Sequence, residues 1–191
     1  MSVYDLIRAR RTIRRFKQIP VPEDLLEKMV DAARLAPSAS NMQPLEYVVV
    51  QNKEVVERIF PCLKWAAYIA PEGNPVPGQE PVAYIVTVVN TAVRTKAFEW
   101  DAGAAIEHMI LTALEEGVGS CWLLSIDKAK IREILHIPAS HELDSVLALG
   151  YPAEEPVSED LVDSVRYWKD DSGRLHVPKR KVGAIIHFNR F

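Results

Sequence analysis

Apolar residues recur along the chain at two spacings, one typical of helices and one typical of buried strands. Helical spacing predicts a short helix after Ser2 and longer helices over residues 22–36, 53–60, 98–117 and 127–135. Short runs rich in β-branched residues predict buried strands over residues 46–50, 82–89, 120–124 and 143–151. Because helices and strands are interspersed with few tight hairpins, we expect a sheet flanked by helices.

Two of these helices carry additional signals. Ser2 and Asp5 fit a capping box, and the apolar face of the first helix comprises Val3, Leu6 and Ile7. The longest helix is small or apolar nearly all round from Ala102 to Leu114, which predicts burial on more than one side.

The last forty residues are patterned differently. Residues 154–163 are acidic and predicted to be exposed, and residues 165–177 resemble two strands around an Asp-Asp-Ser-Gly turn. The apolar run 184–188 has little chain after it. We therefore expect it to pack on earlier parts of this chain or on another chain.

Length and composition limit the possible functions. The chain has 191 residues, of which 48% are hydrophobic, so residues 1–191 are predicted to form a single domain. A net charge of −3 argues against a general nucleic-acid coat protein. With no stretch of 18 apolar residues and no signal peptide, we expect a soluble cytoplasmic protein without a membrane partner.

The cysteines and histidines do not predict a metal site. Cys62 and Cys121 lie too far apart for a CxxC motif, and we expect both to be reduced and buried. The five histidines show no HxxxH pair, so no metal ligand is assigned. The phosphate motifs GxGxxG and GxxxxGK[ST] are also absent from their expected places.

A cluster of basic residues, "RARRTIRRFK", occupies residues 8–17. One interpretation is a solvated face that complements the dipole at the end of a helix. The other is an extended segment that sends Arg10, Thr12 and Arg14 to one side. Two guanidinium groups and a hydroxyl placed together would suit a phosphate monoester.

A second polar stretch, "SASNMQP", separates a predicted helix from a buried strand. Serine and asparagine are common in loops that end helices. Alternatively, the side chains of Ser38, Ser40, Asn41 and Gln43 could pair with the edge of an aromatic heterocycle, because amides offer a donor beside an acceptor.

Five segments together resemble the successive signatures of the nitroreductase family, the FMN-dependent NAD(P)H oxidoreductases. They are "RRTIRRF" at 10–16, "AARLAPSASNMQP" at 32–44, "GVGSCWL" at 117–123, "IPASHELDSVLALGYP" at 137–152 and "VPKRKVGAIIHFN" at 177–189. The segments follow the family's order over nearly the whole chain. This colinearity is more specific than any one motif.

The resemblance implies an α+β sandwich with a mixed, mainly antiparallel sheet flanked by helices. It also implies an interlocked homodimer with two FMN molecules at the interface, in which the C-terminal segment adds to the partner's sheet. Both subunits would contribute to each site. No catalytic side chain is implied, because the chemistry takes place on FMN.

The family's cofactor-binding positions fall on four parts of this sequence. The arginine-rich segment, which would hold the phosphate and the pyrimidine edge, comprises Arg10, Arg11, Thr12 and Arg14. The polar loop, which would reach the flavin from the partner, comprises Pro37, Ser38, Ala39, Ser40, Asn41 and Gln43. A strand end would pass beside the isoalloxazine with Leu123, Leu124 and Ser125, and a C-terminal basic pair would close on the phosphate with Lys179 and Arg180.

The segment that would cover the flavin is short. Many larger relatives carry an inserted helical region there, whereas this chain has only residues 64–81. Trp65 and Tyr68 are the substrate-pocket candidates, and each is either part of the roof of the site or part of the core.

The resemblance therefore implies an enzyme that moves reducing equivalents from NADH or NADPH to a small organic acceptor, such as a nitroaromatic or a quinone. One alternative is a specialised relative of the reductive dehalogenase or flavin-modifying type. Another is a flavin-binding protein without turnover.

Overall fold

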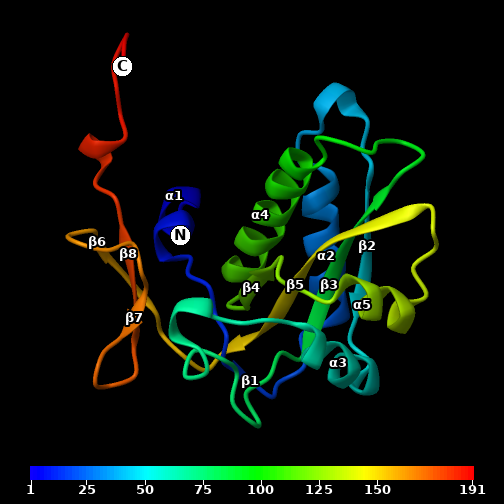
Figure 1. The fold of residues 1–191 in the computed structure, drawn as a ribbon, viewed down its shortest axis with the longest axis horizontal. Helices are drawn as coiled ribbons and strands as arrows, with labels where there is room; N and C mark the ends of the chain where they lie inside the picture. The colour runs from blue at the N-terminus through cyan, green and yellow to red at the C-terminus, as the bar shows by residue number, and fades with distance from the viewer.

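Five strands pair into one sheet at the centre of the molecule (Figure 1). The computed structural model describes residues 1–191. The strands of this sheet are β1 (Phe16–Lys17), β2 (Leu45–Val50), β3 (Ala83–Asn90), β4 (Gly119–Leu123) and β5 (His141–Pro152). The helices are α1 (Val3–Ala9), α2 (Glu23–Arg34), α3 (Lys53–Ile59), α4 (Glu99–Glu115) and α5 (Lys128–Leu135). Short 3-10 turns are η1 (Ala39–Asn41), η2 (Phe60–Cys62), η3 (Ala67–Ile69) and η4 (Val182–Ala184).

The long strand β5 organises the sheet. It pairs antiparallel with β3 along one edge and with β4 along the other, and its last two residues pair with β1, while β2 completes the sheet beyond β3. Gly150 lies where Phe16 crosses β5, and a Cβ atom there would approach the Phe16 ring to 2.9 Å. A glycine is therefore required for β1 to join the sheet.

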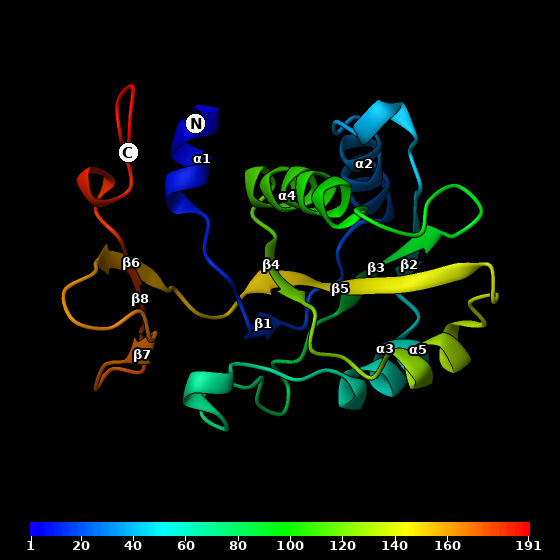
Figure 2. The same cartoon turned by 45° about the horizontal axis from the view of Figure 1, so that its top comes forward.

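Helices cover both faces of the sheet (Figure 2), with α2 and α4 on one side and α3 and α5 on the other. Strand β3 is buried on both faces. Its residues alternate between two cores: Tyr84 and Val86 pack toward α3 and α5, whereas Ala83 and Ile85 pack toward α2 and α4. This arrangement explains the uninterrupted apolar run of β3.

Two helix predictions need correction. The Ser2–Asp5 capping box is present, but Val3 and Ile7 of α1 are exposed and only Leu6 is buried. Helix α4 buries one broad face rather than several. Its other face, which includes Gly103 and Ala104, stays half-buried because no element of this chain packs there.

A separate arm follows β5, formed by β6 (Val157–Asp160), β7 (Trp168–Lys169) and β8 (Leu175–Lys179). The predicted turn joins β7 and β8, which are antiparallel. Strand β6 was expected to be an exposed acidic segment, yet it pairs parallel with β8. Such a short acidic strand has no apolar periodicity, so its pairing comes from backbone hydrogen bonds to β8.

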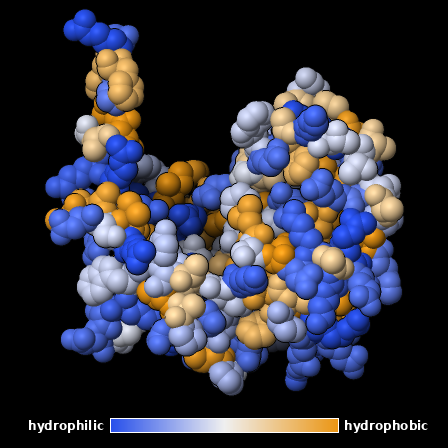
Figure 3. Space-filling view, viewed as in Figure 1, coloured by the Kyte–Doolittle hydropathy of each residue, from blue (hydrophilic) through white to orange (hydrophobic).

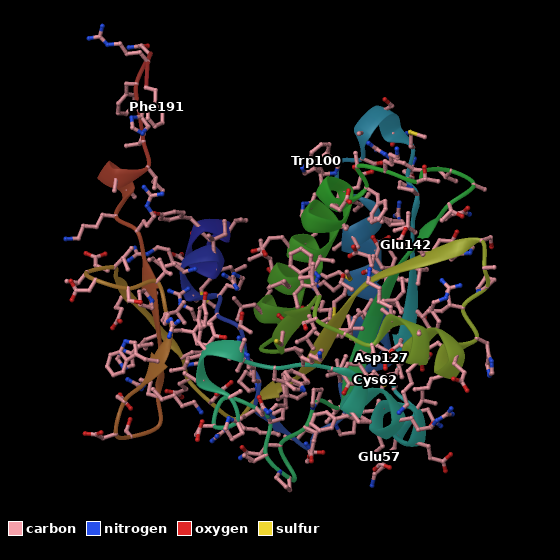
Figure 4. The ribbon with its side chains drawn as sticks, in the orientation of Figure 1. Glu57, Cys62, Trp100, Asp127, Glu142 and Phe191 are labelled. Carbon is pink, nitrogen blue, oxygen red and sulfur yellow. The ribbon has the colours of Figure 1, made fainter.

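The chain ends in an exposed tail. Ile185, Phe188 and Phe191 are exposed, and Figure 3 shows the tail as a mostly apolar column that stands apart from the body. Figure 4 labels Phe191 on this tail below its tip, because the chain turns back and the Phe191 ring stacks on that of His187. The predicted need for a packing partner is therefore not met within this chain. No helix is both long and apolar enough to cross a bilayer.

Candidate functional site

The arginine-rich segment runs along the outer edge of β4. Helix α1 ends at Ala9, and a parallel bridge then joins Thr12 to Ser120. The N–H of Ile13 donates to the Ser120 carbonyl at 2.9 Å, and the Ile13 side chain is buried. These contacts hold the flanking arginines at the surface of the sandwich.

A cavity of about 800 Å³ opens beside this segment. Ile110 and Leu114 from the last turns of α4 form part of its wall, and residues 152–156 form another part. Arg10 and Arg11 both line the cavity, and Arg10 lies 3.6 Å from the Glu107 carboxylate. Two guanidinium groups therefore face one concave surface.

Arg14 points elsewhere, contrary to the expectation that Arg10, Thr12 and Arg14 share one side. Its guanidinium lies 5.3 Å from the centre of the Tyr167 ring, and Arg14 does not line the cavity. The side chains of residues 10–14 do not alternate as they would in a strand, because the only β-bridge that this segment forms is the one at Thr12.

Three guanidinium groups contain buried donors without a partner. The Nε atoms of Arg11, Arg14 and Arg15 are buried and make no hydrogen bond. Burial, and then the charge of Arg10, lowers the pKa of Arg11. A buried unsatisfied donor costs about 1–3 kcal/mol, so this segment is suited to receive an anion.

The nearest thiol is not a reactive group. Cys121 lies on β4 close to Arg14, and burial raises its pKa to about 11. The thiol is thus protonated near neutral pH. Cys62 and Cys121 are both buried and form no disulfide, which confirms the prediction of burial.

The polar loop between α2 and β2 is anchored to the first turn of α4. Ser38 donates its hydroxyl to Asp101 at 2.6 Å, and the Ala39 N–H donates to the same carboxylate at 3.3 Å. The Gln43 N–H donates to the Ser38 hydroxyl at 2.9 Å. Ser38 thus uses its side chain within the protein, whereas Ser40 and Asn41 are exposed.

The predicted strand-end residues differ in exposure. Leu123 is buried in the core, and Leu124 is 60% exposed immediately beyond β4. The Ser125 carbonyl accepts the Lys64 N–H at 3.0 Å. Beyond the Thr12 bridge and the Leu63–Ile126 bridge, no strand pairs with the outer edge of β4, so its backbone groups have no strand partner there.

The C-terminal basic pair lies on the arm. Lys179 ends β8 and is exposed, and Arg180 donates to the Ala184 carbonyl at 2.6 Å. Neither lines the cavity. The arm does approach the arginine-rich segment, because Arg11 donates a hydrogen bond to Ser158 on β6.

The two aromatic candidates have different environments. Trp65 is buried in the core, with its ring centre 5.9 Å from that of Phe60. Tyr68 is 53% exposed, and its ring lies 5.0 Å from Tyr167, the residue that Arg14 contacts. Trp65 is therefore part of the core, as one of the two interpretations held, while Tyr68 remains available to a ligand.

Helix α4 separates the two main groups of predicted site residues. It has 17 residues, with the Asp101-anchored loop at its first turn and the cavity at its last turns. At a rise of about 1.5 Å per residue, Asp101 lies about 14 Å from Ile110 and about 20 Å from Leu114 along the helix axis. Figure 4 shows the exposed Trp100 at the loop end of α4. One chain does not gather both groups around one small molecule.

Sequence reasoning missed two residues of this region, Asp101 and Tyr167. An acidic residue directly before the small and apolar stretch 102–106 was the available signal for Asp101. Tyr167 carried no signal, because its contact with Arg14 joins positions 153 residues apart. Only the tertiary fold brings Tyr167 and Arg14 together.

Comparisons with known proteins agree with this fold. The pattern of the Nitroreductase family matches residues 7–151. A candidate NADH dehydrogenase/NAD(P)H nitroreductase of Methanothermobacter thermautotrophicus is 34% identical over 172 residues, which cover 87% of this chain and 85% of that protein.

Solved structures share the architecture. An FMN-dependent nitroreductase from Clostridium difficile is 25% identical with a TM-score of 0.71, and the match covers 97% of this chain and 98% of that one. A candidate nitroreductase from Desulfovibrio desulfuricans, solved in complex with FMN, is 20% identical with a TM-score of 0.74 and coverages of 100% and 98%. Taken with the match over residues 7–151, these likenesses show that the chain belongs to the nitroreductase family.

Proposed function

We propose that this protein is a homodimeric FMN-dependent oxidoreductase. It would carry reducing equivalents from NADH or NADPH to a small organic acceptor such as a nitroaromatic or a quinone. The family match and the names of its relatives support an oxidoreductase. The finer assignment rests on the residues around the cavity.

The unpartnered guanidinium donors carry this proposal. A phosphate monoester in the cavity would supply the acceptor oxygen that the buried Nε atom of Arg11 lacks. The cavity of about 800 Å³ beside Arg10 and Arg11 lies within the usual range for cofactor sites. These residues therefore fit a flavin phosphate.

Each part of the site has a separate task in this proposal. Arg10 and Arg11 hold the phosphate, Arg14 places positive charge near the pyrimidine edge, and the edge of β4 offers backbone groups to the ring. When bound, FMN supplies two-electron chemistry between the nicotinamide and the acceptor. The short segment 64–81 leaves room for acceptors of more than one shape.

A second copy of the chain would complete the site. The Asp101-anchored loop lies too far from the cavity to serve the same ring within one chain. The uncovered face of α4 and the apolar tail are the surfaces on which the partner would pack.

Anaerobic titration tests the proposal. Protein reconstituted with FMN should be yellow, should bleach when NADH or NADPH is added, and should regain its colour when a quinone or nitroaromatic follows. The faster of the two bleaching rates identifies the preferred nicotinamide. A yellow protein that neither nicotinamide bleaches would instead support a flavin-binding protein without turnover.

Riboflavin is the matched control ligand. It has the same ring as FMN but no phosphate, so FMN should bind much more tightly than riboflavin. Equal dissociation constants would contradict the phosphate assignment while leaving the family membership intact.

A further inference from the structure

The loop that the proposal brings to the partner's flavin has a strained backbone. Ser40, Asn41 and Gln43 have φ values of 56°, 54° and 50°, in the left-handed region that favours glycine. None of the three is glycine, and all are exposed. Something outside the loop must therefore hold this conformation.

Asp101 supplies that restraint through a short relay. Its carboxylate accepts hydrogen bonds from the Ser38 hydroxyl and the Ala39 N–H, at the start of the loop. The Ser38 oxygen in turn accepts the Gln43 N–H from the end of the loop. One carboxylate thus ties together both ends of the strained segment.

The surroundings of Asp101 keep it in place. Asp101 is 4% exposed, and the Nη1 atom of Arg94 lies 3.6 Å from its carboxylate. It also occupies the first turn of α4, where the helix dipole favours a negative charge. A buried carboxylate is costly unless it is paired and hydrogen-bonded, and Arg94, the Ser38 hydroxyl and the Ala39 N–H are the partners that hold Asp101 in this position.

We propose that Asp101 is a positioning residue for the flavin site, acting through Ser38 to set the shape of loop 38–43. This inference rests on the proposed function, because the loop is the part expected to contact the partner's FMN. Asp101 itself lies under the loop and is buried, so its effect on the cofactor is transmitted by Ser38 and the backbone.

The variants are Asp101→Asn, Ser38→Ala, Ser38→Thr and the double variant Asp101→Asn/Ser38→Ala. Asparagine keeps the size of Asp101, but its NH2 group cannot accept a hydrogen bond. Threonine keeps the hydroxyl of Ser38. Glu115→Gln is the matched control, because Glu115 is an exposed acid at the other end of α4 whose partner is Lys28.

Two readouts are measured on folded protein of each variant. Hydrogen exchange of residues 37–44 reports the loop without any cofactor, and FMN titration reports the site. Asp101→Asn and Ser38→Ala should each speed exchange of that segment at least tenfold and weaken FMN at least tenfold, whereas Ser38→Thr and Glu115→Gln should resemble wild type.

The double variant separates positioning from general stability. If Asp101 and Ser38 act through one relay, it should lose no more FMN affinity than the worse single variant. Additive losses that follow the fall in melting temperature would overturn the proposal, as would unchanged exchange of residues 37–44. If wild type fails to bind FMN, the proposed function fails, while the exchange data still decide whether Asp101 holds the loop.

Discussion

The central sandwich and the C-terminal arm are held together by different forces. In the sandwich, Phe16, Met29 and Ile106 are completely buried, and apolar side chains fill both faces of the sheet. In the arm, Leu175 is the only buried residue. The sandwich is stabilised chiefly by the hydrophobic effect, whereas the arm has no core of its own.

Polar contacts replace a core in the arm. His176 on β8 lies between two carboxylates, 2.9 Å from Glu159 and 3.1 Å from Asp170. The Trp168 ring stacks on His176 at 4.3 Å and donates its N–H to Glu159. This cluster connects all three strands of the arm. Order in the arm therefore depends on charge and on contact with other surfaces.

Removing the tail should have the largest effect, because it takes away the apolar surface through which the arm would contact a partner. Deletion of residues 183–191 removes the exposed apolar tail, so we expect a monomer without FMN, or aggregation, while the sandwich keeps its fold. Light scattering and flavin absorbance measure the two losses. Val162→Ser, an exposed apolar residue elsewhere in the arm, is the control. A soluble, yellow, fully active truncated monomer would refute the expectation.

A core substitution should damage the sandwich instead. Phe16→Ala removes a fully buried ring, and we expect the free energy of unfolding to fall by about 3–5 kcal/mol in urea titrations. The half-exposed Ile19→Ala should change it by less than about 0.5 kcal/mol. Trp168→Ala in the arm should leave the main unfolding transition nearly unchanged. A large shift for Trp168→Ala would mean that the two regions unfold together.

The arginine-rich segment lies where the sandwich and the arm meet, and its substitutions test the cofactor contacts there. Arg10→Ala and Arg14→Ala should each weaken FMN by about 1.5–3 kcal/mol, because each removes a charge-assisted contact. Arg8→Ala should change it by less than about 0.5 kcal/mol, since Arg8 is an exposed residue on α1. Arg15 is a poor control because it donates to the Glu72 carbonyl. If substitution of residues 8, 10 and 14 weakened FMN binding equally and slightly, the cluster would act only as a diffuse positive field.

The smallest expected effect is a pH dependence of the arm. Asp170, and then Glu159, raises the pKa of His176, so the protonated ring contributes stability below its ordinary pKa of about 6.5. That contribution is lost as pH rises through the raised pKa. The pKa values of Asp170 and Glu159 are lowered, so their contribution is lost as pH falls through those lowered values.

Hydrogen exchange of residues 168–179 measures this dependence. Exchange, corrected for its intrinsic rate, should be slower at pH 6 than at pH 9 in wild type. In His176→Asn, the corrected exchange rates at pH 6 and pH 9 should be equal. The change should be small, because water screens exposed charges. An unaltered pH dependence in the variant would assign the effect to other groups.

Much of the sandwich was predictable from sequence, because its elements obey local rules. The apolar run of β3 and the capping box at Ser2 each indicate the local structure that forms, and the same holds for the turn before β8 in the arm. The two-residue β1 was not predictable as a strand. It forms because Phe16 fits against Gly150, a contact between distant parts of the chain.

The site was less predictable for the same reason. The residue types at positions 10–14 indicate phosphate chemistry, but the direction of Arg14 depends on Tyr167 of the arm. Likewise, Ser38 looks like a ligand contact from sequence, although its hydroxyl is occupied by Asp101. Hydrogen bonds between segments decide which polar side chains remain free for a ligand.

The length of α4 has a genetic consequence in the proposed dimer. Because its two ends serve different sites, damage at Arg10 and damage at Asp101 in the same chain would spoil both sites of a homodimer. A mixed dimer that carries each lesion on a different chain would instead concentrate both lesions in one site and leave the other intact. Two inactive variants expressed together should therefore restore up to half the activity per mixed dimer, which is intragenic complementation.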